Sequence, residues 1–147
     1  MKLDILAFGA HPDDVEISCG ATLLKYAKEG KSIGIIDLTE GELGTRGSSE
    51  KRYEEANKAA EILGLKIRQN LNMGDGFIAQ SEENKLKIIE CIRKYQPELI
   101  LANSVHDRHP DHAKGAKLVA EASFLSGLRK IETKSDGLPQ QAYRPKM

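Results

Sequence analysis

The sequence alternates four short apolar runs with four longer segments of helical spacing, and this alternation limits the fold more than any other feature. The apolar runs have strand length and consist mostly of β-branched residues and leucine. They cover Leu3–Gly9, Ser32–Leu38, Lys66–Leu71 and Glu98–Asn103. Strand–helix repeats of this kind fold through right-handed crossovers into a parallel sheet that is covered on both faces. The sequence therefore predicts a Rossmann-like α/β fold with a mostly parallel sheet.

Capping residues indicate where the helices begin and end. We expect helices over residues 20–29, 49–63, 81–96 and 110–124. Gly30 and Gly64 follow the first two helices and suit the left-handed conformation that ends many helices. Ser81 is a good N-cap for the third helix, and Pro110 is favoured in the first turn of the fourth.

Length and charge fit one domain that binds a small molecule. The chain has 147 residues, of which 39% are hydrophobic and 30% charged, enough for a core of ordinary size. Lys and Arg number 22, as do Asp and Glu, so the formal net charge is zero. No overall field therefore attracts nucleic acid or an anionic membrane, and we expect neither as a partner.

The first apolar run and the two cysteines indicate the compartment. Asp4 interrupts this run, which is too short for a signal peptide or a membrane span, so we expect a cytoplasmic location. Cys19 and Cys91 have no Cys-x-x-Cys partner, which argues against a disulfide framework and a thiolate zinc site. Cys91 is expected in the core.

The chain divides into a folded domain and a short tail. We expect residues 1–131 to form the Rossmann-like domain with both motifs described below. Residues 132–147 are polar, include two prolines and show no helical or strand period. They are expected to be a surface extension, or the start of a C-terminal part that this chain lacks. A sheet of four strands would leave an exposed edge, which that part or another subunit would cover.

Clusters of histidine and aspartate follow the first and the fourth apolar runs. They are "AHPDDVE" at residues 10–16 and "HDRHPDH" at residues 106–112. In the common strand order 3-2-1-4 the two strands are neighbours, so both clusters face the edge where open α/β sheets bind ligands. A single His-Pro-Asp is typical of a turn with an aspartate cap. Two of them at adjacent strand ends favour a metal site.

Imidazole nitrogen and carboxylate oxygen suit zinc, which in catalytic sites has three protein ligands and a water. Iron(II) accepts the same donors. From the residues alone, the three ligands would come from His11, Asp13, Asp14, His109 and His112. The remaining carboxylate and imidazole would move a proton and stabilise an oxyanion, as hydrolysis requires. His106 is a weaker candidate because we expect it in the loop.

A dinucleotide site, which the fold would allow, does not fit the first turn. The fingerprint G-x-G-x-x-G needs three glycines, and "FGAHPDD" offers only Gly9. Asp13, Asp14 and Glu16 would also repel a phosphate. We therefore do not expect a nicotinamide cofactor.

The motif pair "AHPDDVE" and "HPDH" resembles that of the LmbE/PIG-L deacetylases, zinc enzymes that remove acetyl groups from N-acetylglucosamine-type substrates. The resemblance runs from Lys2 to about Lys130. The segments "DLTEGELGTRGS", "DRHPDH" and "FLSGLRKIETK" look like the bacillithiol-biosynthesis branch, whose substrate is N-acetylglucosaminyl malate. Family members often form trimers or hexamers, which implies a homo-oligomer here. They usually continue well beyond the point where this chain stops.

The resemblance implies a role for each motif residue. His11, Asp14 and His112 match the zinc ligands, Asp13 the general base, and His109 the imidazole that stabilises the tetrahedral oxyanion. Zinc lowers the pKa of its bound water to roughly 7. We expect this water to attack the amide carbonyl, with Asp13 taking its proton and later giving it to the leaving amine.

Other residues are expected at the substrate. Arg52 matches a family arginine that contacts the substrate, and an arginine suits the carboxylates of a malate. The residues alone favour a helix charge paired with Glu55. The remaining expected contacts are Glu42 and Arg46 in the glycine-rich loop, Asp75 in "MGDGF", and Asp111, which would also orient a histidine. For Asp75 a plain turn is the alternative.

Two other functions are consistent with the same motifs. One is a deacetylase that acts on another N-acetylglucosamine conjugate or on an oligosaccharide. The other is a metal-binding module that is catalytically incomplete because its C-terminal part is absent.

Overall fold

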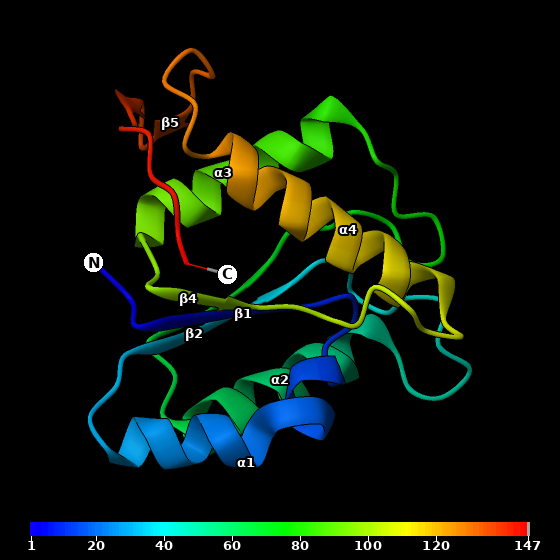
Figure 1. The fold of residues 1–147 in the computed structure, drawn as a ribbon. Helices are drawn as coiled ribbons and strands as arrows, with labels where there is room; N and C mark the ends of the chain where they lie inside the picture. The colour runs from blue at the N-terminus through cyan, green and yellow to red at the C-terminus, as the bar shows by residue number, and fades with distance from the viewer. Residues whose placement is uncertain (147) are drawn as a thin grey trace.

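Four parallel strands form the central sheet in the order β3-β2-β1-β4, which confirms the predicted order and fold class. The computed structural model describes residues 1–146. The strands are β1 (Ile5–Gly9), β2 (Ile33–Asp37), β3 (Ile67–Asn70) and β4 (Leu99–Leu101). The helices are α1 (Asp14–Lys28), α2 (Ser49–Leu63), α3 (Glu82–Tyr95) and α4 (Pro110–Leu125). Helices α1 and α2 lie on one face of the sheet, and α3 and α4 on the other (Figure 1).

The two central strands are buried along their whole length because helices cover both faces. Side chains of β1 alternate between two cores. Leu6 and Phe8 pack on the side of α3 and α4, while Ile5 and Ala7 pack on the side of α1. Strand β1 pairs with β4 in a parallel register. The segments that follow these two strands therefore emerge at the same edge of the sheet.

Helix α1 begins at Asp14, so the predicted start at Gly20 is wrong. Asp14 and Glu16 interrupt the apolar pattern, but they lie in the first turn, where the helix dipole favours acidic residues. Val15 in the first turn and Leu23 farther along are the apolar residues that α1 buries. The second half of the first motif therefore lies on a helix, with Asp13 at its N-cap.

The other helices agree with the predicted bounds to within one residue at each end. Ser48 caps α2 by accepting a hydrogen bond from the backbone N–H of Lys51, and Gly64 ends it in the left-handed conformation. Ser81 caps α3 by accepting from the backbone N–H of Asn84. Cys91 on α3 is buried, as predicted. Within residues 1–146, none of the helices has both the length and the apolar content needed to cross a membrane.

The segment after α4 contains two short strands, although the sequence of residues 132–147 shows no strand period. Strands β5 (Lys134–Ser135) and β6 (Leu138–Pro139) form an antiparallel pair. Farther on, the backbone N–H of Tyr143 donates to Ser126 O, and that of Lys146 donates to Glu98 O next to β4. These contacts hold the segment against the domain. Residue 147 of the predicted tail lies outside the described residues.

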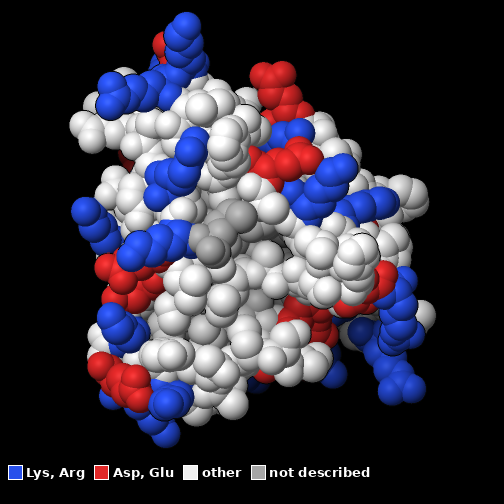
Figure 2. Space-filling view, viewed as in Figure 1, with Lys and Arg blue, Asp and Glu red and all other residues white. Residues whose placement is uncertain are grey.

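Charges of both signs are mixed on the surface. On the face shown in Figure 2, lysine and arginine side chains lie beside aspartate and glutamate side chains instead of forming one continuous basic area. This mixing agrees with the equal numbers of basic and acidic residues in the sequence.

Arg93 on α3 is expected to be essential for stability. Its side chain is buried and donates hydrogen bonds to Ser126 O, Leu128 O, Ile131 O and Thr133 Oγ1. Each buried acceptor that loses its donor costs about 1–3 kcal/mol. We expect Arg93→Met to lower the free energy of unfolding, measured by urea denaturation, by about 3 kcal/mol or more. The exposed Arg129 offers a control, since Arg129→Met should change the free energy of unfolding by less than about 0.5 kcal/mol. Equal losses in both variants would contradict this role.

Candidate metal centre

The two histidine motifs meet at the carboxyl edge of the sheet, as the strand order predicted. Asn103, just after β4, accepts a hydrogen bond from the backbone N–H of Ala10 at 2.9 Å and donates one to Asp14 Oδ2 at 3.1 Å. The ring centroids of His11 and His109 lie 4.7 Å apart, and those of His11 and His112 lie 5.4 Å apart. The structure thus brings the histidines of both motifs into one cluster.

Asp14 lies between two of these histidines. Its Oδ1 is 3.2 Å from His112 Nε2, and its Oδ2 is 3.6 Å from His11 Nδ1. The three histidines also come close together: one ring nitrogen of His11, one of His109 and one of His112 all lie within 4.8 Å of one another. The three histidines thus form one candidate set of donors, and His11, Asp75 and Asp111 form a second. Asp14 contacts both His11 and His112 and could replace His109 as the third donor.

Opposite charges in this cluster shift the pKa of Asp14 and of His11 in opposite directions. Burial by itself raises the pKa of Asp14, but hydrogen bonds with His11 and the charge of His112 outweigh burial and lower this pKa to about 2. Burial likewise lowers the pKa of His11, but the hydrogen bonds and charges of Asp14 and Asp75 outweigh it and raise this pKa to about 9. Near neutral pH the carboxylates of Asp14 and Asp75 are ionised and His11 carries a proton. A divalent cation would replace that positive charge and leave His11 as a neutral ligand.

Two buried carboxylates lie behind His11. His11 Nε2 is 3.0 Å from Asp75 Oδ1 and 3.4 Å from Asp111 Oδ2. Asp111 Oδ2 also accepts a hydrogen bond from the backbone N–H of Gly76 at 2.6 Å. Within the described residues, the buried Oδ1 of Asp111 has no hydrogen-bond partner. A hydrogen bond at Nε2 orients the ring so that Nδ1 faces Asp14. Both carboxylates therefore support the orientation of His11.

Asp75 and Asp111 were expected at the substrate, and a substrate contact stays a prediction for both. Both are buried, and both face His11. For Asp111 this agrees with its second expected role of orienting a histidine. Asp75 lies in a turn, as the alternative interpretation expected, and its side chain also contacts His11 far away in the sequence.

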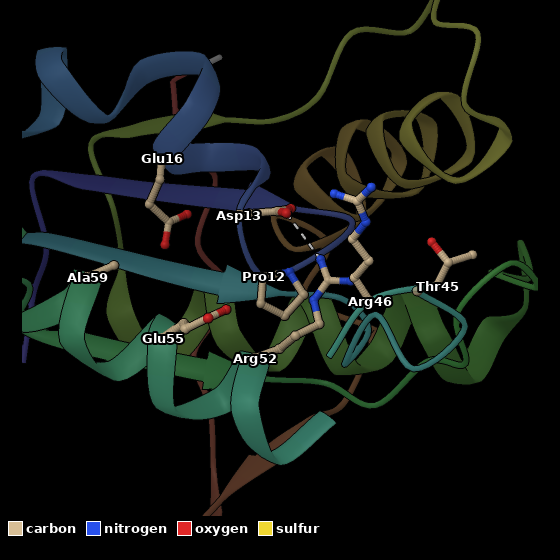
Figure 3. Close-up of a pocket in the computed structure, with 9 residues that line it drawn as sticks. Pro12, Asp13, Glu16, Thr45, Arg46, Arg52, Glu55 and Ala59 are labelled. Carbon is tan, nitrogen blue, oxygen red and sulfur yellow. Dashed lines mark hydrogen bonds and ion pairs between the residues drawn. The ribbon is translucent and has the colours of Figure 1, made fainter. Parts of the chain in front are cut away.

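Asp13 borders a cavity of about 540 Å³ and pairs with Arg52. Arg52 Nη2 donates to Asp13 Oδ2 at 3.1 Å, and Nη1 donates to Gly41 O at 3.1 Å. Figure 3 shows Arg52 reaching from α2 toward Asp13, with Arg46 beside the same cavity. Arg52 thus contacts a motif residue, and Glu55, its alternative partner from the sequence, lines the cavity.

His109 and His112 are held by neighbouring groups. His109 Nδ1 accepts a hydrogen bond from the backbone N–H of Asp111 at 3.3 Å and so caps α4. His112 Nδ1 is 3.0 Å from Asp107 Oδ2, which leaves its Nε2 facing Asp14. His106 is exposed and bonds through its backbone to Ser104.

Sequence reasoning did not single out Asn103 or Asp107 as site residues. Only weak indications of their role are visible in the sequence: Asn103 ends the fourth apolar run, and Asp107 stands within the second histidine motif. The direction of each side chain depends on tertiary contacts.

Glu42 and Arg46 lie on the loop between β2 and α2. Glu42 Oε1 accepts a hydrogen bond from the backbone N–H of Asp75 at 2.7 Å, so it joins the loop to the turn after β3. Arg46 is exposed and lines the cavity beside Asp13. Of these two expected substrate contacts, only Arg46 borders that cavity.

A parallel α/β sheet with clustered histidines and carboxylates at its carboxyl edge defines a Rossmann-like protein with a candidate metal centre. The chain belongs to the PIG-L family, described as GlcNAc-PI de-N-acetylase, which residues 6–123 match. Both histidine motifs lie within the matched range.

Similar proteins include a conserved protein known from its crystal structure, a deacetylase and a hydratase. The conserved protein TT1542 from Thermus thermophilus superposes with a TM-score of 0.89 at 41% identity, over 97% of this chain and 63% of that one. The diacetylchitobiose deacetylase of Thermococcus kodakarensis is 32% identical over 134 residues, which are 84% of this chain and 50% of that protein. GalB, the 4-carboxy-2-hydroxymuconate hydratase of Pseudomonas putida KT2440, has a TM-score of 0.78 at 26% identity, over 88% of this chain and 59% of GalB. The chain thus spans half of the Thermococcus enzyme.

Proposed function

We propose that this chain carries the catalytic centre of a metal-dependent N-deacetylase that acts on an N-acetylglucosaminyl conjugate. The position of two adjacent aspartates is the main support. Asp14 lies between His11 and His112, while Asp13 borders the neighbouring cavity and pairs with Arg52. In this arrangement Asp14 can bind a cation, while Asp13 can act on a substrate in the cavity. The deacetylase names of the family and of the Thermococcus relative agree with this role.

The donors present fit zinc or iron(II). We propose that His11, Asp14 and His112 hold the cation, since these imidazole and carboxylate donors form the type of set found in catalytic zinc sites. A bound cation of this kind polarises a carbonyl and lowers the pKa of water.

We propose that Asp13 is the general base and acid. Its carboxylate takes a proton from the water that attacks the amide carbonyl carbon, and it returns this proton to the nitrogen as the C–N bond breaks. The products are acetate and a free amine. The side chain is 49% exposed, so substrate and water can reach it. Arg52, 3.1 Å away, holds the carboxylate in place through its hydrogen bond.

We propose that His109 donates a hydrogen bond to the oxyanion of the tetrahedral intermediate. Its Nδ1 accepts a hydrogen bond from the backbone N–H of Asp111. A neutral imidazole that accepts at Nδ1 carries its proton on Nε2. The helix cap therefore selects the tautomer that has a donor at Nε2. A donor of this kind acts most strongly on the charge that develops during the reaction.

We propose that the substrate is an anionic conjugate such as N-acetylglucosaminyl malate. The cavity is lined by Arg46 and Arg52 and also by Asp13, Glu16 and Glu55. Arg46 is exposed, and a guanidinium group binds a carboxylate through two parallel hydrogen bonds, so Arg46 is the main support for an anionic substrate. Diacetylchitobiose has no carboxylate that could form such a pair.

Acetate release with matched substrates tests this assignment. We expect kcat/KM for N-acetylglucosaminyl malate to exceed that for its dimethyl ester and for diacetylchitobiose by about tenfold or more, because a charge-assisted hydrogen bond contributes about 1.5–3 kcal/mol. Equal values would rule out the anionic substrate. Bound metal without acetate release from any of the three substrates would favour the metal-binding module.

A further inference from the structure

The two carboxylate oxygens of Asp75 contact two different parts of the molecule. Oδ1 is 3.0 Å from His11 Nε2, and Oδ2 accepts a hydrogen bond from the backbone N–H of Leu43 at 2.9 Å. The backbone N–H of Asp75 donates to Glu42 Oε1 at 2.7 Å. Asp75 therefore joins the turn after β3, the candidate ligand His11, and the loop between β2 and α2. Its 8% exposure means that solvent cannot easily replace these partners.

The same loop also contacts the proposed base. Gly41 O accepts a hydrogen bond from Arg52 Nη1, and Arg52 Nη2 donates to Asp13. Gly41 has a positive φ of 66°, and a Cβ there would lie 2.7 Å from the Arg52 guanidinium. Glycine at this position thus lets the loop backbone and Arg52 approach closely. A continuous set of contacts runs from His11 through Asp75 and the loop to Arg52 and Asp13.

We propose that Asp75 is a positioning residue that couples the order of the loop between β2 and α2, residues 38–48, to cation binding at His11. The proposal rests on the proposed function only in taking His11 as a cation ligand. When His11 is held with Nδ1 toward the cation, its Nε2–H donates to Asp75 Oδ1. This bond fixes the carboxylate so that Oδ2 receives the N–H of Leu43. Because coupling between two sites is reciprocal, an ordered loop also strengthens cation binding.

The variant Asp75→Asn tests the contacts with His11 and Leu43 with little change in the shape of the side chain. An asparagine has one acceptor oxygen, so it can serve His11 or Leu43 but not both. We expect its Zn²⁺ affinity, measured by competition with a chromophoric chelator, to fall about 10- to 100-fold. In the unmodified chain, we expect Zn²⁺ to slow amide hydrogen exchange in a peptide that covers residues 40–46. In the variant this slowing should be lost.

Two further variants make the result specific. Asp136→Asn has the same change of charge at a side chain that is 85% exposed and should behave as the unmodified chain does. Glu42→Ala removes the acceptor for the Asp75 N–H and leaves the contact with His11 in place. It should increase exchange in the loop and lower Zn²⁺ affinity less than Asp75→Asn does. Circular dichroism melting would show that each variant is folded.

The outcomes separate this inference from the deacetylase assignment, because neither measurement uses a substrate. Weaker Zn²⁺ binding with an unchanged response of the loop would make Asp75 a support for His11 alone and would overturn the coupling. Unchanged affinity and unchanged exchange would also overturn it. Intact coupling in a protein that releases no acetate would instead contradict the proposed function.

Discussion

Asp13→Asn should lower kcat for acetate release by about 10³-fold and leave the metal content unchanged. Asparagine has the shape of aspartate, but it cannot accept the proton of the attacking water. Asp13 borders the cavity and pairs with Arg52, whereas Asp14 contacts His11 and His112. The metal donors therefore keep their places in the variant. Metal content would be measured by elemental analysis of protein purified without chelators.

The control for this prediction is Asp136→Asn, which should keep the unmodified kcat and metal content. Loss of metal in Asp13→Asn would reverse the roles of the two aspartates. A kcat within about tenfold of the unmodified value would show that another group moves the proton.

The sheet and most helix ends could be predicted because local rules determine them. Apolar runs of strand length, Ser48 and Ser81 as N-caps, and Gly64 as a left-handed cap are each visible in a few consecutive residues. The start of α1 was missed because its first turn is acidic and because Asp13 turns its carboxylate toward Arg52. The strands β5 and β6 have two residues each, too few for a period to be visible.

The meeting of the two motifs also followed from the sequence, because strand order alone brings their strand ends together. The partners of His11 did not follow from it. Asp75 lies 64 positions from His11 in the sequence, and only the packing of the turn after β3 directs its carboxylate to Nε2. Asn103 joins the end of β4 to the first motif for a similar reason, since its side chain bonds to Ala10 and Asp14 after β1. Sequence patterns identify donors, while tertiary packing decides which atoms they face.

The second large effect is expected on metal content, and it decides whether Asp14 or His109 is the third ligand. We expect Asp14→Asn to lose its stoichiometric metal, because the variant replaces an anionic donor between His11 and His112 with a neutral amide. His109→Gln should keep the metal and lower kcat about 10²- to 10³-fold, as loss of an oxyanion donor does. Both properties would be measured on the same preparations by elemental analysis and acetate release.

Asp14→Asn is a fair test because the asparagine oxygen can still accept from the backbone N–H of His11, so the start of α1 should keep its structure. Urea denaturation of both variants would verify this. The reverse result, with metal lost in His109→Gln and retained in Asp14→Asn, would make the three histidines the ligands. The centre would then carry one more positive charge, because a neutral imidazole would replace a carboxylate among the ligands. Asp14 would orient His112, and the oxyanion would need a donor other than His109.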